Sequence, residues 1–135
     1  MTWDYVSGFF DADGCITLST YRKNDPVKTV YVSFDNTQRE ILETIREFIL
    51  EQTGHAASIC AKPPRKENHS VSYVLKYDHV NKCEDIIKHM SCAHPIKRRK
   101  IELVLSRMRK LTPRNGKYTE QLIADRLAFE QEFFQ

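Results

Sequence analysis

Close to the start of the chain lies the stretch Val6-Ser7-Gly8-Phe9-Phe10-Asp11-Ala12-Asp13-Gly14. We expect a short helix over Trp3–Asp13, because the glycine that follows is a residue type common just after a helix C-terminus. Gly8 and Ala12 lie one turn apart on this helix, and Ser7 is next to Gly8. Such a stripe of small residues allows another helix to approach closely. The alternative is that Gly8 only makes room for a core side chain of the same chain.

Two carboxylates, those of Asp11 and Asp13, lie at the end of this helix. The negative end of a helix dipole disfavours an anion by roughly 0.3–1 kcal/mol, so two acidic residues there are an inconsistency of the kind that marks functional sites. A hard divalent cation such as Mg²⁺ would relieve it, because Mg²⁺ prefers oxygen ligands. The alternative is that one aspartate caps the following turn and the other is solvated.

The rest of the chain alternates between strand-like and helix-like patterns. Apolar and polar residues alternate over Cys15–Lys23 and over Val27–Asp35, with turn residues between them, which predicts a hairpin with one apolar face. The downstream patterns predict a helix that begins at the capping box Thr37–Glu40 and ends at Gly54, strands Ala57–Lys62 and Val71–Tyr77 around a polar, basic loop Pro63–Ser70, a helix capped by Asp78, and helices Pro95–Leu111 and Tyr118–Phe133.

Hairpins separated by helices predict an α+β fold, in which an antiparallel sheet packs helices on one face. The other face of the sheet is predicted to be polar and able to form hydrogen bonds. It comprises Thr17, Ser19, Tyr21, Thr29, Tyr31, Ser33, Ser58, Lys62, Ser72 and Lys76. One interpretation is a solvated face, which antiparallel sheets tolerate. The other is a surface that recognises base edges in a DNA groove, where mixed donors and acceptors are needed.

Length and composition indicate one globular domain, residues 1–135. Hydrophobic residues make up 41% of the chain, and no apolar run reaches the ~18 residues that a membrane span requires. No basic region precedes an apolar one at the N-terminus, so we expect no signal peptide. The four cysteines are widely spaced and include no C-x-x-C pair, which favours reduced thiols. We therefore expect a soluble, intracellular protein without a membrane partner.

Basic residues are concentrated in one segment. Residues 95–117 contain nine Lys and Arg against one acid, Glu102, whereas the last seventeen residues contain four acids and one base. The overall net charge of +3 conceals this contrast. A segment of this kind predicts a polyanionic partner.

The stretch at 6–14 resembles the nine-residue motif of the LAGLIDADG homing endonucleases. The positions that match outright are Gly8, Asp11, Ala12, Asp13 and Gly14, and Val6, Ser7, Phe9 and Phe10 replace residues of similar character. Cys15–Leu18, Phe34–Thr37 and Pro95–Leu105 also resemble the family, in the same element order. Since the motif occurs once, the chain resembles the single-motif members, which act as homodimers.

This resemblance implies the αββαββα homing-endonuclease fold, with a four-stranded antiparallel sheet that saddles the DNA major groove and with extra C-terminal helices. It implies a dimer interface formed by the motif helix, through Ser7, Gly8, Asp11 and Ala12. Asp13 would hold the metal, Mg²⁺, with the backbone carbonyl of Ala12 as a further ligand. Each protomer would then bring one carboxylate to one scissile phosphate.

The resemblance also implies catalytic roles for Lys97 and Asn36. Lys97 would stabilise negative charge at the phosphate or orient water, but Lys97 and its neighbours could equally be phosphate-positioning or solvated charges. Asn36 would order active-site water, but it could equally cap the second helix. Phosphate contacts are also expected from Arg22. The other predicted DNA contacts are Thr17, Ser19, Tyr21, Lys23, Lys28, Tyr31, Ser33, Lys62, Lys66, Ser72, Lys76, Arg98, Arg99 and Lys100.

The sequence thus predicts a site-specific, Mg²⁺-dependent endonuclease of double-stranded DNA that serves intron homing. As a homodimer it would recognise a long, near-palindromic site, because a two-fold protein matches a two-fold target. Two other functions remain open. One is a maturase that binds intron RNA, and the other is a non-catalytic DNA-binding protein on the same scaffold.

Overall fold

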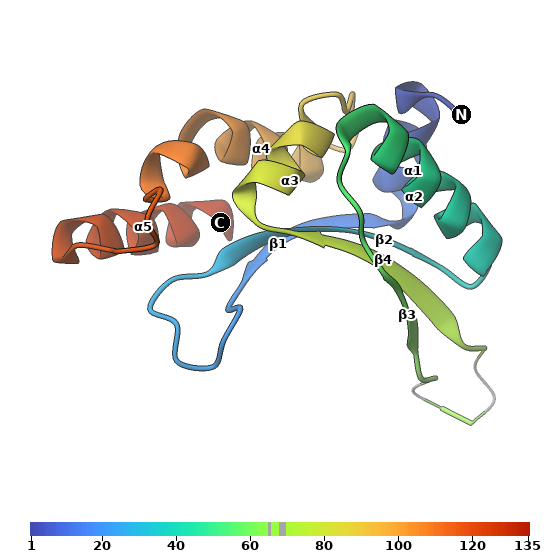
Figure 1. Cartoon of the computed structure of the whole chain (residues 1–135), viewed down its shortest axis with the longest axis horizontal. Coiled ribbons are helices and arrows are strands. Elements are labelled where there is room, and N and C mark those ends of the chain that lie inside the picture. The colour runs from blue at the N-terminus through green and yellow to red at the C-terminus, as the bar shows by residue number, and fades with distance from the viewer. Residues whose placement is uncertain (65, 68–69) are drawn as a thin grey trace.

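The computed structural model describes residues 1–64, 66–67 and 70–135, and it confirms the α+β fold (Figure 1). Helices lie over one face of a four-stranded antiparallel sheet. The elements in chain order are α1 (Trp3–Asp13), β1 (Gly14–Ser19), β2 (Thr29–Asn36), α2 (Arg39–Thr53), β3 (Ile59–Lys62), β4 (Ser72–Asp78), α3 (Val80–Ile87), α4 (Pro95–Leu103), the π-helical turn η1 (Val104–Met108), the 3-10 turn η2 (Arg109–Leu111) and α5 (Glu120–Phe133).

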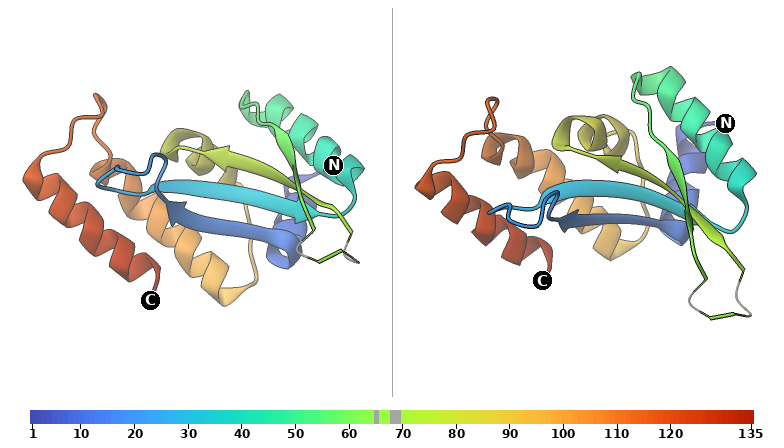
Figure 2. Two further views of the ribbon diagram at one scale, coloured as in Figure 1. Left: turned by 90° about the horizontal axis from the view of Figure 1, so that it is seen from below. Right: turned by 60° about the horizontal axis from the view of Figure 1, so that its bottom comes forward.

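The strands lie in the order β1-β2-β4-β3, so β1 and β3 form the edges of the sheet. β1 pairs with β2 in the first hairpin, and β3 pairs with β4 in the second. The two hairpins are joined by the antiparallel pairing of β2 with β4. Seen from below, the strands lie in front of the helical layer (Figure 2). The sheet bends so that its helix-free face is concave (Figure 1). The saddle shape that the family resemblance implies is therefore present.

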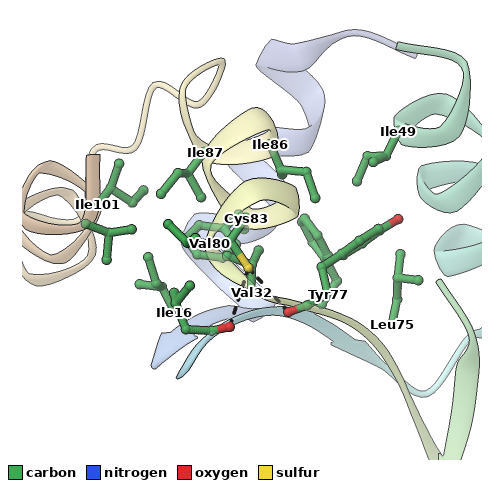
Figure 3. Packing of buried hydrophobic residues seen from close by; sticks show 14 of the residues in the cluster. Ile16, Val32, Ile49, Leu75, Tyr77, Val80, Cys83, Ile86, Ile87 and Ile101 are labelled. Carbon is green, nitrogen blue, oxygen red and sulfur yellow. Dashed lines mark hydrogen bonds between the residues drawn. The ribbon is translucent and has the colours of Figure 1, made fainter. Parts of the chain in front are cut away.

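The period-two pattern of the strands sends apolar side chains to the helical layer. Ile16, Val32, Leu75 and Tyr77 are buried there, and they belong to one core cluster with the buried residues of α3. Cys83 of α3 lies in the middle of this core, and its thiol contacts the carbonyl oxygens of Val30 and Tyr77 (Figure 3). One core therefore holds both hairpins and the first three helices together.

The opposite sheet face has the expected polar composition. The strand registers place Thr17 opposite Tyr31, Ser33 opposite Lys76, and Lys62 opposite Ser72, all with the same side-chain parity. Tyr21 and Ser58, which were assigned to the same face, lie outside the strands, and both are exposed. The concave face is thus built from strand residues that alternate with the core residues.

Gly14 ends α1 as predicted, although by a different mechanism. Its φ angle is −101°, which is extended backbone, so no left-handed residue is required there. Instead, a Cβ at this position would lie 2.2 Å from the Phe10 ring. Glycine is needed because the Phe10 ring fills the space that a side chain would occupy.

Two predicted helix caps are wrong. Gln38, not Thr37, is the N-cap of α2, and its side chain makes no capping hydrogen bond. Asn36 Oδ1 accepts the Gln38 N–H at 2.8 Å. At the start of α3, Asp78 still belongs to β4. His79 is the N-cap instead, and its Nδ1 accepts the N–H of Asn81 at 3.2 Å. In both cases the strand extends further than the alternation alone indicated.

The predicted helix Pro95–Leu111 is continuous but changes its winding. It is an α-helix only to Leu103, and the π-helical turn η1 and the 3-10 turn η2 complete it. α5 lies beside the end of the sheet that carries the β1–β2 loop (Figures 1 and 2). Within the described ranges, no helix has both the length and the apolar character of a membrane span.

Candidate active site

The C-terminal end of α1 brings Asp13 next to Asn36. Asp13 is the last residue of the helix, and Asn36 ends β2, so both lie where the sheet meets the helical layer. Asn36 Nδ2 donates to Asp13 Oδ2 at 3.4 Å, while Asn36 Oδ1 accepts the N–H of Gln38. Asn36 is not the N-cap of α2, but its side chain accepts an N–H just before that helix and also faces the exposed Asp13 carboxylate. The role of Asn36 in ordering water stays a prediction.

Lys97 reaches the same helix end from α4. Its Nζ donates to the backbone carbonyls of Phe10 and Asp11, both at 2.8 Å, and lies 5.4 Å from the centre of the Phe10 ring. A cation at the carbonyl end of a helix is stabilised by the helix dipole. Lys97 therefore places a positive charge within one turn of Asp13, but two of its three N–H donors are bound to backbone carbonyls.

Asp11 caps a helix that is distant in sequence. Its Oδ2 accepts the N–H of Ala93 at 2.8 Å, and its Oδ1 accepts the N–H of His94 at 3.3 Å. These bonds, that of Ala93 foremost, hold the pKa of the Asp11 carboxyl below its usual value. His94 is the N-cap of α4, so the Asp11 carboxylate also lies at the favourable pole of that helix.

The small residues of α1 divide between two faces. Gly8 and Ala12 are exposed, and a Cβ at Gly8 would meet no described atom within 4 Å. The intrachain explanation of Gly8 is therefore wrong, since no core side chain among the described residues fills its space. Ser7 points the other way: it is 3% exposed, and its Oγ donates to the carbonyl of Trp3 and accepts the N–H of Ser91. The prediction that Ser7 faces a partner is wrong, because the hydroxyl is bonded inside the protomer.

The concave sheet face carries both charges and aromatic groups. Lys76 Nζ lies 4.2 Å from the centre of the Tyr31 ring, and Lys62 Nζ lies 2.6 Å from a carboxylate oxygen of Asp35. Burial raises the pKa of the Tyr31 phenol above its ordinary value, which already lies well above neutral pH. We did not single out Asp35 from the sequence, although its place in the alternation of Val27–Asp35 puts it on this face.

Part of the basic segment serves to hold α5 in place. Arg99 donates to the carbonyls of Glu132 and Gln135 at the end of α5, and Lys100 Nζ lies 5.1 Å from the centre of the Phe133 ring. Arg99 and Lys100 therefore have a structural role within the chain, and their DNA contacts stay a prediction. Arg98, which directly precedes Arg99 in α4, is exposed.

The loop residues among the predicted DNA contacts differ in their surroundings. Tyr21, Arg22, Lys23 and Lys66 are exposed. Lys28 is half-buried, and its Nζ lies 5.0 Å from the centre of the Phe134 ring, so this side chain turns toward α5. Residues 65, 68 and 69 of the predicted basic loop lie outside the described part of the chain.

The donor set at the end of α1 suits a hard cation. Asp13 is exposed and offers its carboxylate, and the adjacent Ala12, also exposed, offers its backbone carbonyl. Both groups are oxygen donors of the type that Mg²⁺ prefers. Across residues 1–64, 66–67 and 70–135, no three His, Cys, Asp or Glu side chains gather as a metal-binding group. The oxygen donors offered here are thus the Asp13 carboxylate and the Ala12 carbonyl, fewer than the full set of ligands that Mg²⁺ takes.

A family model described as "LAGLIDADG-like domain" matches residues 4–91, which is more than half of the chain. No curated protein matches the sequence. The fold is similar to that of the homing endonuclease I-CvuI in complex with its target, with a TM-score of 0.70 at 18% identity over 98% of this chain and 79% of that chain.

Two longer structures are similar as well. The LAGLIDADG meganuclease I-AabMI, bound to uncleaved DNA, gives a TM-score of 0.67 at 17% identity over 96% of this chain and 43% of that chain. The LAGLIDADG homing endonuclease I-LtrWI, bound to target DNA, gives 0.61 at 13% identity over 98% of this chain and 44% of that chain. This chain therefore spans less than half the length of either.

Proposed function

Because the chain belongs to the family of LAGLIDADG-like domains and has the fold of LAGLIDADG homing endonucleases, we propose that it is a site-specific, metal-dependent endonuclease that cleaves double-stranded DNA as a homodimer. One observation carries this proposal: Asp13, Asn36 and Lys97 converge at the C-terminal end of α1. The exposed stripe of Gly8 and Ala12 lies on the same helix. The proposed site, to which β2 and α4 also contribute, and the proposed surface for a second protomer thus share α1.

Association through α1 follows from the exposed small residues. A backbone without side-chain bulk at Gly8 allows a second helix to approach closely, and no described atom of the same chain occupies that space. The matches also support two copies, because this chain covers 43% of I-AabMI and 44% of I-LtrWI. A dimer would have roughly the size of such a longer chain and would bring two Asp13 residues toward one axis.

In the proposed mechanism Asp13 is the residue of each protomer that holds a divalent cation, Mg²⁺, with the carbonyl of Ala12 beside it. When bound, the cation would supply Lewis-acid chemistry for hydrolysis of the phosphodiester. Asn36 Nδ2 donates to the Asp13 carboxylate at 3.4 Å and would help to orient it. Lys97 stabilises the end of α1 and contributes positive charge near a phosphate through its third N–H donor.

DNA would bind across the concave sheet face, with the strands in the major groove. Tyr31, Ser33, Lys62 and Lys76 offer hydrogen-bond donors and acceptors there, as recognition of base edges requires. Exposed basic residues such as Arg22 and Lys23 would hold the phosphate backbone. Since each neutralised phosphate releases counterions, binding should weaken steeply with added salt.

The direct test is to incubate the purified protein with a randomised duplex library and Mg²⁺ and to sequence the ends that form. We expect paired ends at one near-palindromic site. Tight DNA binding without any cleavage would contradict the nuclease and favour a non-catalytic DNA-binding protein. Tight binding to structured intron RNA with no DNA cleavage would favour the maturase.

Replacing Asp13 with Asn tests the residue that the mechanism depends on. We expect Asp13→Asn to lower the cleavage rate by about 10³-fold or more, the scale of losing a group that acts only in the transition state. Binding to the selected duplex should persist, because Asp13 is exposed and makes a single long hydrogen bond. Asp4→Asn, at the other end of the same helix, is the matched control. Cleavage by Asp13→Asn at the wild-type rate would contradict the mechanism.

A further inference from the structure

Only two charged side chains are buried among the described residues, and both belong to α5. Arg126 is 2% exposed and Glu130 is 5% exposed. Burying a charge is costly unless it forms strong hydrogen bonds, so such residues are kept where their contacts matter. These two lie one turn apart, outside the segment 4–91 that the family model matches.

Both buried charges bind the backbone of one residue, Lys28. Glu130 Oε1 accepts the N–H of Lys28 at 3.1 Å, and Arg126 Nη2 donates to the carbonyl of Lys28 at 2.6 Å. Lys28 immediately precedes β2, and the β1–β2 ladder ends where Ser19 pairs with Thr29. The two side chains of α5 therefore hold the backbone at the point where the β1–β2 loop joins the sheet.

The loop Thr20–Lys28 has few other contacts that could fix its position. Arg22 and Asp25 close a turn within it, through the Arg22 N–H on Asp25 Oδ2 at 2.7 Å and the Asp25 N–H on the Arg22 carbonyl at 3.1 Å. Cavities of about 400 Å³ and about 740 Å³ lie between the loop and its surroundings, and both are lined by Lys28 and by α5 residues. Open space thus flanks the loop on the side of α5, and the polar contacts at Lys28 join the end of the loop to that helix.

We propose that α5 positions the β1–β2 loop for DNA recognition, with Glu130 and Arg126 as positioning residues that act through the backbone of Lys28. The proposal rests on the proposed function for the DNA contact of the loop, whose exposed residues include Tyr21 and Lys23. β1 separates Asp13 from the loop by six residues, which is about 20 Å at the rise of an extended strand. The loop would thus contact base pairs about six steps from the cleaved bond.

Hydrogen exchange of the protein without DNA tests the positioning itself. Glu130→Leu removes the acceptor of the Lys28 N–H, whereas Glu130→Gln keeps an acceptor oxygen at the same place. We expect faster exchange in residues 20–28 for Glu130→Leu, near wild-type exchange for Glu130→Gln, and unchanged exchange for the matched control Glu132→Leu, which lies on the same helix and pairs with Arg107. Arg126→Met should also speed exchange in the loop. Wild-type exchange of the loop in Glu130→Leu would overturn the proposal.

The second readout is base discrimination, measured with the duplex that the wild type selects and with the same duplex altered about six base pairs from the cut. We expect the preference for the unaltered duplex to fall roughly tenfold in Glu130→Leu, on the scale of one lost base contact, and to recover in Glu130→Gln. An equal loss of affinity for both duplexes, or an unchanged preference, would overturn the role in recognition. If the wild type selects no duplex, the proposed function fails, while the exchange data still decide whether α5 positions the loop.

Discussion

At the C-terminal end of α1, two carboxylates and one ammonium group meet the negative end of the helix dipole. The Lys97 ammonium donates hydrogen bonds to the carbonyls of Phe10 and Asp11. The backbone N–H groups of Ala93 and His94 donate to the Asp11 carboxylate. Asp13 is left exposed with one long contact, to Asn36. Hydrogen bonds thus offset the unfavourable effect of the helix dipole on the Asp11 carboxylate. The Asp13 carboxylate lacks comparable contacts among the described residues, and it is the one that a cation could reach.

The capping role of Asp11 predicts a stability effect. Asp11→Asn keeps one of the two acceptor oxygens and removes the charge at the start of α4, and we expect it to lower the free energy of unfolding by about 1 kcal/mol at pH 7, the scale of one lost hydrogen bond. Urea denaturation of both proteins measures the difference.

The same residue predicts a pH dependence. The folded-state pKa of Asp11 lies below its unfolded value, so its contribution is complete above the unfolded value and is lost as the pH falls through the folded value. The difference between the wild type and Asp11→Asn should therefore shrink in acid. A difference that stays constant from pH 7 to pH 2 would contradict the hydrogen-bonded carboxylate.

At the scale of elements, α1 packs one face inside the protomer and leaves the other open. Gly8 is in the helix interior, where glycine costs about 1 kcal/mol relative to alanine, yet a Cβ there would meet no described atom within 4 Å. We therefore expect Gly8→Ala to raise the thermal stability of the monomer. If α1 pairs closely with a second copy, the same change should weaken the dimer.

Sedimentation equilibrium and thermal unfolding of Gly8→Ala measure these opposite effects. A variant that is more stable as a monomer and dimerises as well as the wild type would show that the partner does not approach Gly8 closely.

The placement of the cysteines over the elements predicts their reactivity. Cys83 lies in the core between α3 and the sheet, and burial raises the pKa of its thiol to about 12. Burial raises the pKa of the Cys92 thiol to about 11. Cys15 and Cys60 lie on the exposed edge strands. At pH 8, iodoacetamide should modify these two in the native protein and all four in denaturant, as mass spectrometry would report. Rapid native modification of Cys83 would contradict the packing of α3.

At the scale of the whole molecule, local patterns in the sequence predicted most elements and the face of the sheet to which each strand residue belongs. Period-two alternation is sufficient to assign Thr17 and Ile16 to opposite faces of the sheet, since the side chains of neighbouring strand residues point to opposite sides. It could not locate the ends of β2 and β4, because strand length depends on pairing between hairpins, and that error displaced both helix caps.

Long-range contacts are the part that the sequence could not provide. Asp11 binds residues more than eighty positions away, and Arg126 binds the carbonyl of Lys28, 98 positions away. Neither pairing follows from composition or spacing. The exposure of Gly8 and the burial of Ser7 are likewise consequences of how α1 docks, because both residues are small and neither favours a face by its chemistry.

Native mass spectrometry of the protein with its selected duplex, in Ca²⁺ to slow cleavage, tests the two-fold arrangement most directly. The proposed mechanism predicts two 15.9 kDa chains on each duplex, so that both strands meet an Asp13. A duplex that carries one chain and is still cut in both strands on addition of Mg²⁺ would contradict it.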